Sequence, residues 1–385
     1  MESKHMLNRI TTTKSWMVAS LLAATSVFAQ DSNSAPAPTK CRPQKSYEQG
    51  HELTASQMMA AYNAPARIDV RGAWDFYATG TFVYWQPLQD NMELAVASTT
   101  RASLTSAAVN GSAGNPGNII NMDFDYKPGF KVGLGMNFDY DNWDGYAEYT
   151  WFHGTNTQSS NASSTGALFA FVGHPSIVGT NGYNTGSENW KLKMDFADVN
   201  LGRSYYVGTK LSFRPFMGAR GAWIRQRANY TFVNDGTLGF GTAGTLTSLN
   251  KSVSWGVGPS VGMSSNWMFG YGLRATGVVN ADLLFTRYNT SIFELFTGNN
   301  LTFNTNQHHA NTLRPHANLE MGFGWGSYFD NNNWHFDLLA TYGFQVFWNQ
   351  NMFRHYTDDV RLSNSNMPNG DLYVQGLNLS ARLDF

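Results

Sequence analysis

The sequence predicts an all-β protein, a transmembrane antiparallel β-barrel of about ten strands with long extracellular loops and short periplasmic turns. Three observations carry this prediction. The 385 residues contain no run of about 18 apolar residues, and the mean hydropathy is -0.34, so helical membrane spans are excluded. Aromatic residues make up 15% of the chain, which is typical of the aromatic girdles of barrels. Successive segments also alternate between apolar and polar residues.

Both ends of the chain carry patterns of export to the outer membrane. Lys4, Arg9 and Lys14 precede an apolar stretch over 16–29, which predicts a secretory signal peptide over residues 1–29. The last segment alternates between apolar and polar residues and ends on the aromatic Phe385, as the final strand of an outer-membrane barrel does. The predicted location is therefore the outer membrane of a Gram-negative bacterium, with membrane lipid as a partner.

Residues 30–70 are predicted to form a periplasmic linker with one short helix. The first part is rich in Pro, Ser and Ala, whereas Thr54 and Gln57 have the spacing of a capping box and Pro65 ends the helical pattern. The helix either rests below the barrel or plugs its lumen. Cys41 is the only cysteine, so it is either a free thiol or forms an intermolecular bridge.

The barrel is predicted over residues 71–385. Its strands are joined alternately by long polar connections and by short turns with turn-forming residues. The long connections are 86–122, 154–189, 231–250, 289–312 and 349–371, and the short turns are 141–145, 206–209, 264–266 and 328–333. This alternation gives about ten strands, with the long loops outside the cell. A hairpin hidden in either of the first two connections would raise the number to about twelve or fourteen.

The apolar parity of each strand must face lipid, because Arg or Lys at the bilayer midplane costs about 2 to 4 kcal/mol. The other parity then lines a polar interior. The predicted pore-lining residues are Lys131, Asp195, Arg214, Arg220, Arg274, Asp282 and Glu320. The same parity holds Glu148, Lys191, Lys193, Arg314 and Asp337, and a bulge at residues 197–198 would reverse the assignment beyond it.

Two interpretations of these inward charges remain open. Acidic and basic side chains that face a water-filled channel would form a constriction with a transverse field. Alternatively, they pair with one another and fill a narrow barrel, because about ten strands is close to the size at which side chains fill the interior.

Five segments resemble the pore-forming major outer membrane proteins of Legionella and of chlamydia-like bacteria. They are 62–70 (YNAPARIDV), 74–76 (WDF), 82–86 (FVYWQ), 198–203 (DVNLGR) and 211–224 (LSFRPFMGARGAWI), and the resemblance extends over essentially the whole mature chain. It implies a β-barrel porin that is abundant in the outer membrane and sometimes exposed to host cells. The family often has a cysteine shortly before the first strand, where this chain has residues 71–73 (RGA), so a disulfide-linked envelope is not implied here.

No enzyme motif is convincing. His308 and His309 lie in a predicted polar loop, and with His316 and Glu320 they match no spacing of a helix-borne metal site. We therefore expect no catalytic, metal or cofactor site. The net charge of -1 gives no basic excess for nucleic acid.

The expected function is a porin for passive diffusion of small hydrophilic solutes and ions, with homo-oligomerisation left open. The alternative is a structural or adhesive surface protein that uses the barrel as an anchor and contacts a host surface through its loops.

Overall fold

The computed structural model describes residues 68, 70, 75–98, 117–138, 143–178, 182–238, 241–356, 365–366 and 370–385. The predicted signal peptide over 1–29, the helix predicted between Thr54 and Pro65, and Cys41 lie outside the described residues. Within the described part, no helix combines the length and the apolar character needed to cross a membrane.

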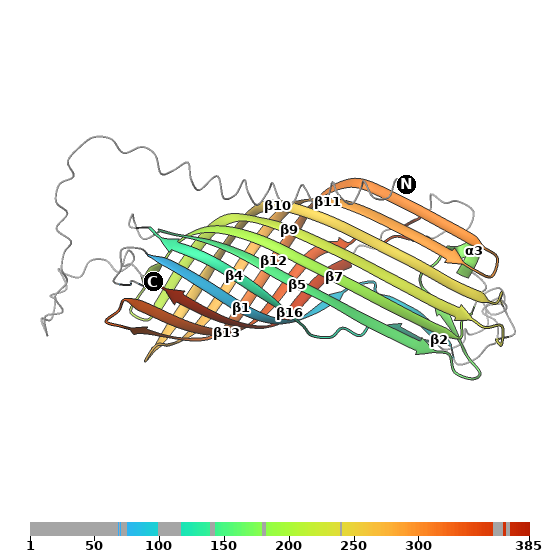
Figure 1. The fold of residues 1–385 in the computed structure, drawn as a ribbon, viewed down its shortest axis with the longest axis horizontal. Helices are drawn as coiled ribbons and strands as arrows, with labels where there is room; N and C mark the ends of the chain where they lie inside the picture. The colour runs from blue at the N-terminus through green and yellow to red at the C-terminus, as the bar shows by residue number, and fades with distance from the viewer. Residues whose placement is uncertain are drawn as a thin grey trace, which may run out of the picture. The chain divides into compact units, whose positions relative to one another are not determined.

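Ten antiparallel strands form a closed ring, which confirms the predicted barrel (Figure 1). Around the ring they are β1 (Phe76–Gln89), β4 (Lys127–Asn137), β5 (Trp143–Asn161), β7 (Thr185–Arg203), β9 (Leu211–Asn234), β10 (Gly244–Gly270), β11 (Leu273–Phe296), β12 (Leu301–Phe329), β13 (Trp334–Asn351) and β16 (Gly370–Asp384). The ring closes because β1 pairs with both β4 and β16, and β10 pairs with both β9 and β11. Closure satisfies the backbone groups that lipid cannot.

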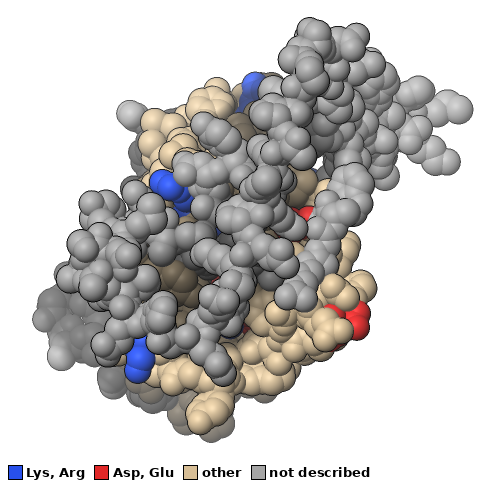
Figure 2. Space-filling model, turned by 90° about the vertical axis from the view of Figure 1, so that its left-hand side faces the viewer, with Lys and Arg blue, Asp and Glu red and all other residues tan. Residues whose placement is uncertain are grey.

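The first and last strands meet at the end of the barrel that holds the C-terminus. The backbone of Phe76 donates to Phe385 at 3.3 Å, and Phe385 donates back at 3.0 Å. The turns that follow β4, β7, β10 and β12 lie at this same end, and the short β8 (Tyr205–Val207) pairs with β9 within one of them. In Figure 2, which views this end, the visible acidic and basic side chains lie in small separate spots.

Two of the predicted long loops are largely strand. β9 continues to Asn234 and β10 begins at Gly244, and only four residues separate the end of β11 at Phe296 from the start of β12 at Leu301. The prediction failed because it looked for apolar residues on alternate positions. Beyond the bilayer the outer face of a strand can be polar, so pairing continues after the apolar alternation has ended.

The first two long connections contain extra strands that do not widen the ring. β3 (Gly117–Asn121), β2 (Glu93–Ser98) and β6 (Ala167–Ala170) form a separate three-stranded sheet, which we call the mouth sheet. The helix α3 (Pro175–Val178) follows β6, and β14 (His355–Tyr356) pairs with β15 (Ser365–Asn366). β2 and α3 lie at the right-hand end of the barrel in Figure 1, opposite the C-terminus.

The strands of the ring have an apolar outer face and a polar inner face. On the outside, Leu134 and Phe323 are each 68% exposed, whereas Ser260, Asn280 and Thr341 on the inner parity are buried. The predicted inward and outward faces agree with the structure for most strands, because a period of two residues fixes which side chains share a face.

The facing predicted for β7 is wrong. Lys191, Lys193 and Asp195 share their parity with Leu201, which is exposed on the outer face. The register of β7 with β5 and β9 is continuous through residues 197–198, so no bulge forms there. The rule that lipid excludes outward charge failed because these residues lie at and beyond the edge of the apolar surface.

Candidate functional site: the barrel interior

The end of the interior that lies near the C-terminus is built around Asp144. Arg214 Nε donates to Asp144 Oδ1 at 2.8 Å, and the Tyr77 hydroxyl donates to the same carboxylate at 3.3 Å. The guanidinium of Arg382 lies 3.6 Å from the centre of the Tyr77 ring, a cation–π contact. The inward Gly135 leaves room for this ring, because a Cβ at that position would overlap it.

Two further ion pairs lie on the inward parity at this end, one between β11 and β13 and one within β16. Arg274 Nη2 is 2.6 Å from Asp337 Oδ2, and Arg382 Nη2 is 2.5 Å from Asp384 Oδ1. His335 Nδ1 is 3.2 Å from the other oxygen of Asp384. The predicted inward residues Arg214 and Arg274 are therefore each held by a carboxylate.

Arg220 organises one side of the middle of the interior. Its Nε donates to Asp198 Oδ1 at 2.6 Å, and its Nη1 donates to Asp282 Oδ2 at 2.7 Å. The same Nη1 is 2.9 Å from His316 Nδ1, and the guanidinium lies 5.7 Å from the centre of the Phe196 ring. Four strands thus converge on one guanidinium, and its charge is balanced by the two carboxylates.

Lys131 spans the interior at the same level. It projects from β4, and its Nζ is 3.4 Å from Glu320 Oε1 on β12 and 3.8 Å from Glu148 Oε1 on the adjacent β5. β4 and β12 are not neighbours, because β1, β16 and β13 lie between them in the ring. One lysine side chain therefore bridges the lumen, and Trp85 packs 5.4 Å from its ammonium.

These charged groups are buried but retain small exposed fractions. The side chains of Lys131, Glu320 and Arg220 are each 13% exposed, whereas Asp282 has no exposed side-chain surface. Charges removed from water cost several kcal/mol each unless they are paired and hydrogen-bonded. Pairing across the lumen offsets this cost and holds the cross-section narrow.

An apolar core fills the other end of the barrel. Leu94 of the mouth sheet packs with Leu168, Trp190, Phe232 and Phe296, and all five side chains are fully buried. The wall around this core lies outside the bilayer, because β7 carries the exposed Lys191 at this level, on the outer face. The mouth sheet therefore occupies the extracellular opening of the barrel.

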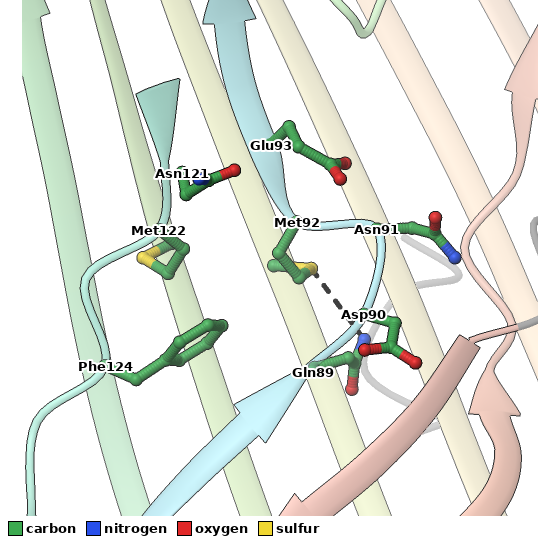
Figure 3. Close-up of a pocket in the computed structure, with 8 residues that line it drawn as sticks. All are labelled: Gln89, Asp90, Asn91, Met92, Glu93, Asn121, Met122 and Phe124. Atoms are coloured by element: carbon green, nitrogen blue, oxygen red, sulfur yellow. Dashed lines mark hydrogen bonds between the residues drawn. The ribbon is translucent and has the colours of Figure 1, made fainter. Parts of the chain in front are cut away.

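A pocket of about 440 Å³ lies at the edge of this core (Figure 3). It lies between the segment that joins β1 to β2 and the segment that joins β3 to β4, and Phe124 and Met122 stand on the second segment. The full lining is Gln89, Asp90, Asn91, Met92, Glu93, Asn121, Met122 and Phe124. Gln89 donates to the Met92 sulfur at 3.7 Å across its floor.

Two carboxylates are buried in the extracellular part of the interior. Burial raises the pKa of Glu188 to about 8, although a hydrogen-bonding contact with Tyr230 opposes the rise. Burial also raises the pKa of Glu294 to about 7, although Ser248 and the backbone of His174 donate to it. Neither group was singled out in the sequence, because nothing in a polar segment marks a side chain that tertiary packing will bury.

Six of the seven predicted pore-lining residues lie on the inward parity. They are Lys131, Arg214, Arg220, Arg274, Asp282 and Glu320. Asp195 does not, because it lies on the outer face, where Tyr149 donates to it at 3.0 Å and Arg225 contacts it at 3.0 Å. Whether the six line a conducting path stays a prediction.

Asp144, Asp198 and His316 are among the members of this site that the sequence did not assign to the interior, and Asp144 falls in the predicted turn 141–145 but lies in β5. Asp198 takes the place expected of Asp195 beside Arg220. His316 was considered only with His308 and His309, which lie in an extended part of β12. On the neighbouring strand β5, Tyr146 faces inward and Tyr149 faces outward. Asp198 of β7 pairs with β5 on the same parity as Tyr146, so the parity of β5 could have indicated that Asp198 faces inward.

The chain matches one protein family and is weakly similar to several solved structures. The family model described as the Legionella pneumophila major outer membrane protein precursor matches residues 69–385. The outer membrane protease OmpT from Escherichia coli is similar in structure at 8% identity, with a TM-score of 0.42, over 81% of this chain and 96% of that chain. A Pseudomonas aeruginosa FadL homologue is similar at 9% identity, with a TM-score of 0.27, over 81% and 90%. No curated protein sequence matches the chain.

The family match covers the entire barrel, including every strand of the ring and the charged interior between them. The closed antiparallel ring and its apolar outer face require a lipid environment. The chain therefore belongs to the Legionella major outer membrane protein family and is a β-barrel of the outer membrane of a Gram-negative bacterium.

Proposed function

We propose that this protein is a narrow channel for passive diffusion of ions and small hydrophilic solutes, and that it is not an enzyme. The observation that carries the proposal is the cluster of charged side chains from six strands near the middle of the interior. An anchor needs only a filled barrel, and apolar residues of similar volume would fill it at lower cost than buried charges. Fixed charges of both signs favour a wetted path.

The described conformation is narrow at two levels. The Lys131–Glu320 bridge crosses the middle of the lumen, and the mouth sheet with its apolar core occupies the extracellular opening. Conduction then requires displacement of the mouth sheet, while the bridge limits the size of the solute. This arrangement predicts discrete openings, each with a conductance smaller than that of a wide general porin.

The test is single-channel conductance of the refolded protein in a planar bilayer. Wild-type protein should give small, discrete conductance steps, and the Lys131→Ala, Glu320→Ala variant should give larger ones because it removes the bridge from both sides. Lys251→Ala, on the outer face, is the matched control and should conduct as wild type does. Folded barrels that stay silent in both wild type and the double variant would overturn the channel proposal.

A second candidate is a surface protein that uses the barrel as an anchor. The observation that favours it is the apolar core in the mouth, which makes the extracellular end a packed unit with polar connections around it. Contacts with a host or neighbouring surface through these connections, and a homo-oligomer, belong to this candidate. Silent folded barrels that bind cells through residues 86–122 or 154–189 would support it.

A further inference from the structure

A row of tryptophans marks the extracellular edge of the apolar outer face on one side of the barrel. Trp151 on β5 lies opposite Asp195 on β7, which lies opposite Trp223 on β9, which lies opposite Trp255 on β10. Tryptophan is enriched where a barrel passes from hydrocarbon to headgroups. This row therefore places the boundary of the outer leaflet.

Five cations lie on the same face within the next two rows on the extracellular side. Lys193 and Arg225 are cross-strand neighbours in the first row, and Lys191, Arg227 and Lys251 are consecutive neighbours in the second. We call these five residues the basic band. Strands lie about 4.8 Å apart and alternate residues about 7 Å apart, so the five positions fall within about 12 Å.

The basic band is not neutralised by the protein. Arg225 is 3.0 Å from Asp195, and among the described residues no ion pair is formed by Lys191, Lys193, Arg227 or Lys251. Lys191, Arg227 and Lys251 are also exposed. Since the whole chain has a net charge of -1, five cations beside one carboxylate reflect local clustering and not the composition.

A recess of about 250 Å³ adjoins the basic band. Lys191 and Lys193 line it together with His153 and with Lys127, which stands at the start of β4. The recess forms because β4 begins at Lys127 whereas its neighbour β5 continues to Asn161, so the upper part of β5 lacks a partner on that side. Lys127 Nζ is 3.1 Å from the carboxylate of the exposed Asp125. Lys191 and Lys193 form no ion pair with a described carboxylate.

We propose that the basic band and this recess bind the phosphate groups of a phosphorylated glycolipid in the outer leaflet. Clusters of Lys and Arg at the edge of a membrane attract anionic headgroups, and each cation near the surface contributes about 1 kcal/mol. The guanidinium of Arg227 can hold a phosphate with two hydrogen bonds, and the lysines supply point charges on either side. The acyl chains then lie against the apolar surface on the other side of Trp223 and Trp255.

Position decides between a lipid and a soluble anion. A site for a soluble phosphate would gain nothing from lying directly above the tryptophan row, whereas a lipid contacts the band and the apolar wall together. The ligand is therefore a lipid whose phosphate groups lie at the level of the basic band.

The test measures binding of diphosphorylated lipid A to the full-length protein in detergent. Wild type should bind it with an affinity that falls as salt rises, and the Lys191→Gln, Lys193→Gln, Arg227→Gln, Lys251→Gln variant should bind at least about tenfold more weakly. The single variant Lys191→Gln should weaken binding, whereas the matched Lys210→Gln, at the opposite end of the barrel, should not. Heat-modifiable gel mobility verifies folding, and the single variants keep the test informative if the fourfold variant does not fold.

Three results would overturn the proposal. They are equal binding of lipid A by wild type and the folded variants, equal binding of lipid A from which the phosphates have been removed, and stronger binding of inorganic phosphate or heparin than of lipid A. Conductance depends on the interior of the barrel, whereas lipid A binding depends on its outer face. The channel proposal can therefore fail without affecting this one.

Discussion

At the scale of single residues, the arrangement of the interior depends on which charged side chains lie close enough to pair. Arg220 has two carboxylates and a histidine within 3 Å of its nitrogens, and Lys131 has carboxylates on two different walls. Removing one member of such a group leaves a buried charge without its partner, which costs about 3 to 5 kcal/mol. Substitutions at this level therefore need a folding control before conduction is interpreted.

The Arg214→Ala, Arg220→Ala variant should shift the ion preference of the channel toward cations. Both guanidiniums lie on the inner face, and fixed positive charge in a channel wall raises the local concentration of anions. The reversal potential in a salt gradient measures the shift. An unchanged potential in a folded, conducting variant would show that neither arginine lines the path. Arg225→Ala, on the outer face of the same strand, is the matched control.

At the scale of elements, the mouth sheet differs from an ordinary surface loop. Long polar connections are usually dispensable for folding, and by this rule shortening 86–122 or 154–189 would leave the rest of the protein unaffected. The structure instead places β2 and β6 from these connections in the apolar core of the mouth. Shortening either connection should leave the ring intact, because its ten strands close without the mouth sheet, but should loosen the extracellular opening.

Leu94→Ala should destabilise the mouth sheet by about 2 to 5 kcal/mol, since it creates a cavity around a fully buried side chain. Limited proteolysis should cut the mouth sheet faster, while the heat-modifiable mobility of the barrel stays unchanged. Leu134→Ala, on the exposed outer face of β4, is the control and should leave proteolysis unchanged. Loss of the folded band in Leu94→Ala would mean that the mouth sheet is required to form the ring.

At the scale of the whole molecule, the barrel has three parts along its axis. Ion pairs around Asp144 fill the end near the C-terminus, the Arg220 and Lys131 groups bridge the middle, and an apolar core fills the extracellular end. The last part lies outside the bilayer and contains the buried Glu188 and Glu294. Its stability should therefore depend on pH.

The mouth should lose stability as the pH rises from about 6.5 to about 8. The pKa values of Glu188 and Glu294 are raised to about 8 and about 7, so the folded state binds more protons than the unfolded state and loses stability as these groups ionise. Burial lowers the pKa of His355, so its effect is confined to lower pH. The protection factors of the mouth sheet, which are corrected for the intrinsic rise of amide exchange with pH, should fall over this range and stay level in the Glu188→Gln, Glu294→Gln variant. A fall in that variant equal to that of wild type would contradict the assignment.

The sequence by itself determined the barrel, its ten strands, the end at which the short turns lie and the inward face of most strands. These properties depend on a period of two residues and on turn residues, which are local. Local patterns also misled where lipid no longer constrains the outer face, as at Lys191, Lys193 and Asp195 in β7 and in the predicted loop 289–312.

Only the tertiary structure decided which charges meet and what fills the mouth. Lys131 and Glu320 are separated by 189 positions in the chain, and their contact depends on the closure and narrow bore of the ring. The basic band likewise exists only because the registers of β7, β9 and β10 align five cations beside a tryptophan row. Register between strands is set by the packing of the whole barrel, and no single segment of the sequence encodes it.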